Sequence, residues 1–323
     1  MAVINIKTNK IRLLAVSFFL LLLPPVCSCE HPGGGGRNPE ETPDEATGPI
    51  VRIASFNIRL ATDSDTGVRA WSARKEACTQ VVQRYAFGVW GLQEVLSIQQ
   101  TDLKALLPQY DFYFVGRDDG TAGEAVGIAW LRSKYECLDK GHFWLSSTPD
   151  VPSGSESWGG MARHRVAVWA RFRDMSTGIN FYFFSTHLEV GEDYTDIRLR
   201  SAELIVEREK MLNSSGLPVF IVGDMNPIAP TEKSMRKFRE TYVDAWQQAE
   251  ADGVREGPVG SYNGFNPDVN LETQSRRGDY IFYKGDVKLL GYRCIDDKFN
   301  GQYPSDHLPV MADMQIEEYS VDE

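Results

Sequence analysis

Polar residues suited to acid–base or metal chemistry recur where apolar segments of this chain end. Residues 219–222 are apolar without interruption, and Gly223 then leads into Asp224 and Asn226. Such a run predicts a strand buried on both faces, followed by a turn that presents a carboxylate and an amide to one pocket. There the carboxylate holds or deprotonates a water, and the amide donates to a phosphoryl oxygen. A plain Asp-x-Asn turn is the alternative interpretation.

Similar polar groups stand at the ends of other predicted strands. They are Asn57, Glu94, His187, Asp279 and the pair Asp306 and His307. Singly, each has a structural explanation, such as a histidine satisfied in the core or a glutamate that caps the next helix. Their recurrence favours a shared site, because open sheets bind ligands beyond the ends of their strands.

The donor types in this set indicate a hard divalent cation. Glu94, Asp306 and Asn57 offer only oxygen ligands, which suit Mg²⁺, with Mn²⁺ as an alternative. The sequence has no Cys/His cluster at metal-ligand spacing, which disfavours zinc. Two histidines beside carboxylates suit proton transfer and charge stabilisation while water attacks a phosphoryl group. These residue types are therefore chemically suited to in-line attack of water on a phosphoryl group beside a divalent cation.

The elements that position these residues begin with an alternation of strand and helix. A strand is predicted at 51–60, followed by a helix at 71–85, a second strand at 87–95 and a second helix at 98–107. An antiparallel meander is predicted next, with strands at 110–115, 124–131, 141–145, 165–172 and 180–186. Later helices are predicted at 197–212 and 234–249, and later strands at 278–283, 287–295 and after His307. This order predicts one layered α/β domain over residues 50–319.

Residues outside the strand ends are candidates for substrate contact. The loop at 149–164 is long and rich in Ser and Gly, and loops of this kind are often functional. It carries Trp158, Arg163 and His164, and Arg59 near the end of the first strand joins them. Trp71 and Arg74 either contact the substrate or pack and cap a helix, and the sequence leaves that choice open.

The amino-terminal residues indicate export. Basic residues precede an apolar run at 13–26 that is too short for a comfortable membrane span and suits a signal peptide. The run ends in a segment that resembles a bacterial lipobox with Cys29 as the lipidated residue, and cleavage with release is the alternative. We expect a signal peptide over 1–29, a flexible Gly/Pro-rich linker over 30–49, and a protein that is lipid-anchored at the cell envelope or outer surface, or secreted.

Composition limits the partners of this 323-residue chain. Its formal charge of −11 and pI near 5.1 give no electrostatic footprint for tight nucleic-acid binding. We expect no stable nucleic-acid partner, no membrane contact except through a lipid anchor, and a monomer. Cys78, Cys137 and Cys294 are spaced too widely for a metal site, and we interpret them as small hydrophobes with one disulfide possible.

As an ordered set, seven segments resemble the endonuclease/exonuclease/phosphatase superfamily, which has the DNase I-like fold. They lie at 55–59, 92–95, 123–128, 185–188, 223–226, 278–281 and 305–310. The resemblance spans about residues 51–316. It implies a four-layer α/β sandwich, in which two mainly antiparallel or mixed sheets pack face to face with helices outside. It also implies divalent-metal-dependent hydrolysis of a phosphate ester.

The resemblance also implies roles for the metal-binding and phosphate-facing residues. Glu94 matches the principal metal ligand, with Asn57 and Asp306 beside it. His307 matches the residue that faces the scissile phosphate, as base or charge stabiliser, and Asp279 matches its orienting carboxylate.

Further roles follow from the same resemblance. Glu124 is similar to the carboxylate that supports the second histidine, here His187. Asp224 matches the group that positions or deprotonates the attacking water, and Asn226 matches a phosphate-oxygen donor. Whether His307 or Asp224 is the base stays open.

The nature of the substrate is the least constrained expectation. The acidic charge and the absence of a basic stripe favour a small phosphorylated molecule, such as a sugar phosphate or a lipid headgroup. A secreted scavenging nuclease acting on DNA or RNA is the alternative. A non-catalytic surface binding module is a third interpretation, and the presence of Glu94, Asp306 and His307 argues against it.

Overall fold

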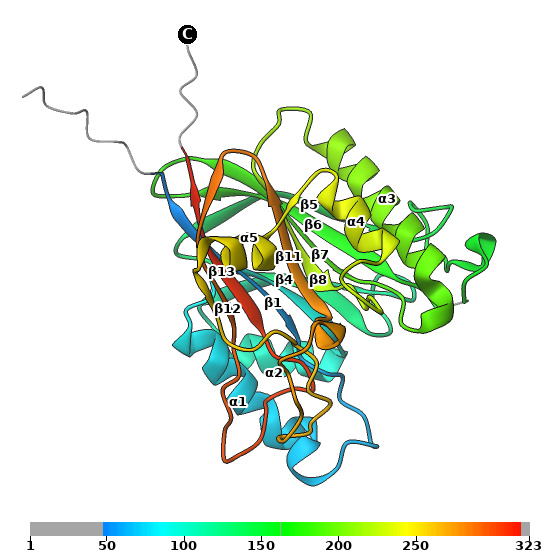
Figure 1. Cartoon of the computed structure of the whole chain (residues 1–323). Coiled ribbons are helices and arrows are strands. Elements are labelled where there is room, and N and C mark those ends of the chain that lie inside the picture. Colours follow the sequence, from blue (N-terminus) through cyan, green and yellow to red (C-terminus); the bar gives the residue numbers. More distant parts are fainter. Residues whose placement is uncertain (1–47, 162, 318–323) are drawn as a thin grey trace, which may run out of the picture. The chain divides into compact units, whose positions relative to one another are not determined.

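The computed structural model describes residues 48–161 and 163–317. The expected signal peptide, Cys29 and nearly all of the expected linker lie outside these residues. The described chain folds into two β-sheets with helices around them, as Figure 1 shows. Within the described part of the chain, no helix is both long enough and apolar enough to cross a membrane.

The first sheet has seven strands in the order β10-β12-β13-β1-β2-β4-β3. Strands β1 and β2 are parallel, as are β10 and β12, and the other neighbours are antiparallel. The strands are β1 (Ile50–Asn57), β2 (Val89–Val95), β3 (Tyr110–Gly116), β4 (Ala125–Leu131), β10 (Arg255–Glu256), β12 (Val287–Cys294) and β13 (Val310–Ile316).

The second sheet has six strands in the order β5-β6-β7-β8-β11-β9. Only β7 and β8 are parallel in it. The strands are β5 (Tyr135–Trp144), β6 (Val166–Asp174), β7 (Asn180–His187), β8 (Val219–Asp224), β9 (Val243–Asp244) and β11 (Asp279–Lys284). The two sheets are therefore mixed, as the sequence predicts.

Burial on both faces explains why the central strands are apolar without alternation. In β8, Phe220 and Val222 belong to the core between the sheets, whereas Val219 and Ile221 belong to the core beneath the outer helices. The outer helices on that side are α3 (Thr195–Leu212) and α4 (Lys233–Arg239). On the other side α1 (Trp71–Arg84) and α2 (Ser97–Leu106) cover the first sheet through a third core. The four-layer α/β sandwich is confirmed.

The helix predicted at 234–249 is wrong in its middle. Helix α4 ends at Arg239, β9 follows, and α5 covers Ala245–Asp252. The Tyr242 hydroxyl donates to Glu209 at 2.8 Å, and β9 pairs with β11. Asp244 then caps α5 by accepting hydrogen bonds from the backbone amides of Trp246 and Gln247. A tertiary hydrogen bond and a strong N-cap thus override the helical spacing.

The three cysteines in the described residues are free. Cys78 and Cys294 are buried and Cys137 is half-buried, so the disulfide that the sequence allows does not form in this structure.

Candidate active site

Three of the predicted site residues stand side by side along the second sheet. His187 is the last residue of β7, Asp224 is the last residue of β8, and Asp279 is the first residue of β11. The strand register pairs His187 with Asp224 and Asp224 with Asp279. Because β11 runs antiparallel to β8, its beginning meets the ends of β7 and β8. One edge of this sheet therefore carries an imidazole and two carboxylates.

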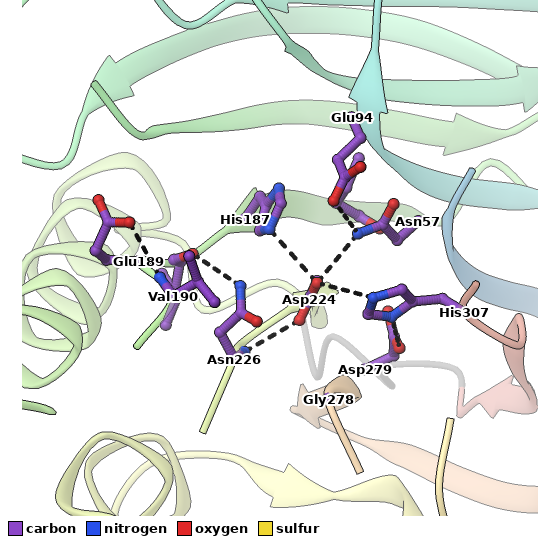
Figure 2. A network of polar contacts seen from close by, with 12 residues as sticks. Asn57, Glu94, His187, Glu189, Val190, Asp224, Asn226, Gly278, Asp279 and His307 are labelled. Carbon is purple, nitrogen blue, oxygen red and sulfur yellow. Dashed lines mark hydrogen bonds and ion pairs between the residues drawn. The ribbon is translucent and has the colours of Figure 1, made fainter. Parts of the chain in front are cut away.

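The first sheet contributes Asn57 and Glu94 to the same place. Asn57 is the last residue of β1, and Glu94 lies in β2 where the register with β4 shifts between Leu92 and Val95. Asn57 Nδ2 donates to Glu94 Oε1 at 3.0 Å and to Asp224 Oδ2 at 3.1 Å. The Asn57 amide therefore joins the two sheets at the centre of the site (Figure 2).

The segment before β13 completes the group. Ser305 Oγ donates to the Asn57 carbonyl at 2.7 Å, which fixes the backbone that carries Asp306 and His307. The predicted residues Asn57 and Asp279 are fully buried around a cavity of about 740 Å³, which is lined by Glu94, Glu124, His187, Asp224, Asn226, Asp306 and His307. The structure thus brings together the strand-end residues that the sequence singles out.

The backbone is strained where it aims these side chains. In the described part of the chain six non-glycine residues have positive φ, and three of them line the cavity. These are Arg59 at 58°, Glu94 at 63° and Asn226 at 47°. Gly223 has φ of 155°, and a Cβ there would collide with the Thr186 carbonyl oxygen of the parallel neighbour strand. Strain of this kind persists where the surrounding structure overdetermines it, and it concentrates at functional sites.

His307 lies between two carboxylates. Its Nδ1 is 2.8 Å from Asp279 Oδ2, and its Nε2 is 3.6 Å from Asp224 Oδ2. Burial alone lowers the pKa of His307, but the charges of Asp279 and Asp224 outweigh burial and hold that pKa well above its ordinary value. His307 is therefore an imidazolium that stabilises negative charge and is poorly suited to accept a proton.

Asp224 is the most connected carboxylate of the site. It accepts hydrogen bonds from Asn57 Nδ2 and from the backbone N–H of Asn226, and it faces both histidine rings (Figure 2). Burial raises the pKa of Asp224 to about 7, although the charge of His307 acts in the opposite direction. A carboxylate with a pKa near neutrality suits a general base better than an ordinary aspartate does.

His187 has the opposite electrostatic surroundings. Its Nε2 is 3.4 Å from Asp224 Oδ2, yet burial and the positive charge of Arg165 lower the pKa of His187 well below its ordinary value. The ring is therefore neutral. Glu124, which was expected to support His187, instead accepts a hydrogen bond from Arg117 Nη1 at 2.7 Å, so any support of His187 is not a direct hydrogen bond between these described side chains.

Buried arginines make the wall beside His187 electropositive. Arg165 is 6% exposed and shares the Glu189 carboxylate with Arg163, through hydrogen bonds of 3.3 and 3.2 Å. The buried Nε atoms of Arg117 and Arg165 have no hydrogen-bond partner in the described residues. Three guanidiniums thus line one wall of the cavity, where they pair with Glu124, with Glu189 behind the wall, and with the more exposed Asp118.

The donor set at the junction of the sheets fits a hard divalent cation. Glu94, Asp306 and Asp224 line the same cavity as Asn57, and burial raises the pKa of Asp306, with the negative charge of Glu94 adding to that effect. A cation relieves this crowding of carboxylates. Asp224, Asp279 and His307 also offer ligand atoms within 4.8 Å of one another. His307 Nδ1 in this trio already lies 2.8 Å from Asp279 Oδ2, so we assign the three side chains to the hydrogen-bonded pair of His307 and Asp279 beside Asp224.

The candidate substrate-contact residues divide into two groups. Arg59 and Arg163 line the cavity, and Arg59 also pairs with Asp65 at 2.9 Å. His164 Nδ1 instead lies 2.9 Å from the Asp118 carbonyl oxygen, and Trp158 lines a separate hollow beside α3. The structure therefore does not place His164 or Trp158 on the cavity wall.

Trp71 and Arg74, for which the sequence allows either substrate contact or a packing role, have packing roles in the structure. Trp71 donates to Asp102 at 2.8 Å, and the buried Arg74 donates to five carbonyl groups. These carbonyls belong to residues 58–60, Arg69 and Pro304, so Arg74 ties the backbone after Asn57 to the backbone before Asp306.

Several cavity residues were missed from the sequence, among them Arg117, Arg165, Val190, Ile228 and Tyr262. A signal existed for Arg165, because it lies two positions after Arg163 at the start of a strand, and such residues share a face. Tyr262 lies in an irregular segment without periodicity, so its position depends entirely on tertiary contacts.

Comparison with known proteins agrees with this geometry. The model of the endonuclease/exonuclease/phosphatase family matches residues 54–307. A solved structure titled as a family member from Bacteroides thetaiotaomicron is 32% identical, with a TM-score of 0.75, over 84% of this chain and 99% of that one. A mannosyl-6-phosphatase from the same organism is 32% identical, with a TM-score of 0.73, over 82% of this chain and 99% of that one.

More distant curated relatives include nocturnin of Xenopus laevis, which is 24% identical over 277 residues, or 77% of this chain. This chain spans 28% to 67% of the length of the curated relatives that it matches. The chain belongs to the endonuclease/exonuclease/phosphatase family of phosphoester hydrolases.

Proposed function

We propose that this protein is a divalent-metal-dependent phosphatase that removes phosphate from a small phosphorylated molecule such as a sugar phosphate. The observation that carries the proposal is the single cavity where Asn57 bonds to both Glu94 and Asp224, between two histidines with opposite electrostatic surroundings. Ion pairs that serve only stability do not need one neutral and one charged imidazole beside a carboxylate of raised pKa. Such an arrangement is typical of catalytic sites.

Each of these residues has a distinct role in the proposed reaction. Glu94, Asn57 and Asp306 would hold a divalent cation, with Mg²⁺ expected and Mn²⁺ as an alternative, which would supply positive charge beside the phosphoryl oxygens. Asp224 accepts a proton from the attacking water. The new P–O bond forms as the bond to the leaving oxygen breaks, and that oxygen takes up a proton from solvent water.

The histidines and Asn226 stabilise the phosphoryl group in this proposal. His307, held charged by Asp279, offers its Nε2 proton to a phosphoryl oxygen. Asn226 Nδ2 donates to the Leu188 carbonyl at 3.1 Å, so its side chain is already oriented at the cavity wall. Of the two candidates for the base, the structure favours Asp224, because His307 already carries a proton.

The electropositive wall supports a monoester as substrate. A terminal phosphate carries one more negative charge than the phosphate of a diester near neutral pH, and Arg117, Arg163 and Arg165 place guanidinium groups on the cavity wall beside His187. The volume of about 740 Å³ falls in the range of small-molecule sites. The 32% identity with a mannosyl-6-phosphatase supports a phosphorylated sugar.

The test is a panel of substrates assayed with Mg²⁺ and with chelator. It contains hexose 6-phosphates, glycerol phosphate, a phosphodiester, phospholipid and plasmid DNA, with Asp306→Ala and His307→Ala beside the wild type. We expect turnover of small monoesters that both substitutions abolish. Strong cleavage of DNA without monoester turnover identifies a nuclease instead, and full activity of both variants refutes the site.

We also propose that the protein is exported and lipid-anchored through Cys29. The proposal is supported by the apolar run at 13–26 and the lipobox-like segment that follows it. In this arrangement the Gly/Pro-rich linker tethers the phosphatase domain to the envelope. Fractionation after metabolic labelling with palmitate tests it: wild type is labelled and membrane-bound, and Cys29→Ser is neither. Equal labelling of both refutes the proposal.

A further inference from the structure

Three exposed apolar side chains border the catalytic cavity. Val190 is 48% exposed, Ile228 is 43% exposed and Tyr262 is 42% exposed, and all three line the cavity. They come from three separate loops, after β7, after β8 and before β11. Exposed apolar side chains are usually scattered singly over a protein surface. Three of them around one polar cavity therefore indicate a surface that contacts a ligand.

The backbones beneath these side chains are fixed. The Val190 amide donates to Glu189 Oε1 at 3.1 Å, and the Ile228 amide donates to Glu232 Oε2 at 2.9 Å. The Tyr262 amide donates to the Arg276 carbonyl at 2.9 Å, and Tyr262 forms a β-bridge with His307. The surface is therefore formed before a ligand binds, which lowers the entropic cost of binding.

The apolar side chains flank the reacting position from two sides. The Tyr262 ring lies against the His307 ring, with centroids 5.1 Å apart and planes inclined at 59°. In the view of Figure 2, Val190 and His307 appear on different sides of Asp224. A phosphate held by Asn226 and the histidines therefore directs its ester group between these apolar walls.

Polar groups interrupt the apolar rim. The Arg276 guanidinium lies over the Tyr262 ring at 5.9 Å, and Glu192 and Ser275 also line the cavity. A pyranose matches this pattern, because its C–H face packs on an aromatic ring while its hydroxyl groups take donors and acceptors at the edge.

We propose that Tyr262, together with Val190 and Ile228 on the same cavity, forms the leaving-group subsite and binds the ring of a hexose phosphate. This inference rests on the proposed phosphatase function and names the recognition element of the same site. The Tyr262 ring supplies the contact and its hydroxyl group does not, so Tyr262→Phe keeps the subsite and Tyr262→Ala removes it.

The experiment measures binding apart from turnover. Titration calorimetry with Mg²⁺ compares methylphosphonate with the phosphonate analogue of a hexose 6-phosphate, in which a methylene group replaces the bridging oxygen. Wild type should bind the sugar phosphonate at least about tenfold more tightly, and Tyr262→Ala should reduce that ratio by about tenfold. Tyr262→Phe should keep the ratio within about threefold. Met175→Ala, an exposed apolar residue at the β6–β7 turn, is the matched control and should not change it.

The outcomes separate this subsite from the proposed function. If Tyr262→Ala weakens both phosphonates equally, or neither, the Tyr262 ring does not contact the leaving group and the inference is overturned. A phenylphosphonate that binds as tightly as the sugar analogue also overturns it, since apolar contact alone then suffices. If wild type hydrolyses no monoester, the proposed function fails, and the Tyr262-dependent ratio still decides the subsite.

Discussion

The pair formed by His307 and Asp279 gives the most demanding test of the site. Asp279 is fully buried, and its Oδ2 accepts from His307 Nδ1 at 2.8 Å and from Ser261 Oγ at 2.6 Å. The substitution Asp279→Asn keeps the volume and leaves an amide oxygen that still accepts from Nδ1. The ring therefore stays oriented, and the substitution removes mainly the negative charge.

The expected loss follows from that charge. A buried hydrogen bond to a charged group contributes about 1.5–3 kcal/mol and a neutral one about 0.5–1.5 kcal/mol. Loss of the difference, about 1–1.5 kcal/mol, from transition-state stabilisation lowers kcat by roughly 5- to 13-fold. Asp279 also raises the pKa of His307. Removing its charge lowers that pKa, so the imidazolium is lost at a lower pH and the alkaline limb of the rate profile moves toward acid.

The assay is kcat against pH for both proteins, with folding checked by circular dichroism. The matched control is Asp174→Asn, a buried carboxylate at the β6–β7 turn that accepts from Ser176 and Thr177. It should lower stability and leave kcat within about threefold of wild type. An Asp279→Asn enzyme with wild-type kcat and an unmoved alkaline limb refutes the role of Asp279.

Three further predictions concern the metal, the base and the backbone. Saturating Mg²⁺ at 100 times its Kd should stabilise wild type by about 2.7 kcal/mol, and Glu94→Gln should abolish that rise in Tm while Asp118→Asn keeps it; an equal rise in all three argues against Glu94 as a ligand. The rate should fall as pH drops through the pKa of Asp224, about 7 before a cation lowers it, so higher Mg²⁺ should move this acid limb to lower pH; a flat profile from about pH 5 to 8 contradicts Asp224 as base. Arg74→Met should lower the free energy of unfolding by about 2–4 kcal/mol in urea, with partial rescue by Arg74→Lys, because buried carbonyl groups lose their donors; an unchanged urea midpoint excludes this role.

The sequence predicts the layered fold because burial determines which positions along each strand and helix are apolar. The uninterrupted apolar run in β8 reflects cores on both of its faces, and the order of strands and helices then limits the topology. The single helix predicted at 234–249 is wrong because contacts distant in the sequence, and not local patterns, determine the structure of its middle. Residues 240–244 are held by Glu209 and by β11, which lie far away in the sequence, and no local periodicity encodes those contacts.

Residue types could identify the catalytic set, but they could not predict how it is aimed. Glu94 reaches Asn57 only because β2 bulges and its backbone takes φ of 63°, and Arg59 and Asn226 take similar left-handed conformations. Such conformations are unfavourable for these residues in isolation, so local sequence argues against them. Arg74 shows what helps to maintain them: one buried guanidinium donates to the carbonyl groups of residues 58–60, and Gln99 also donates to the Arg59 carbonyl. Arg74 also donates to the Pro304 carbonyl, so a residue outside the catalytic set helps to hold the backbone after Asn57 beside the backbone before Asp306.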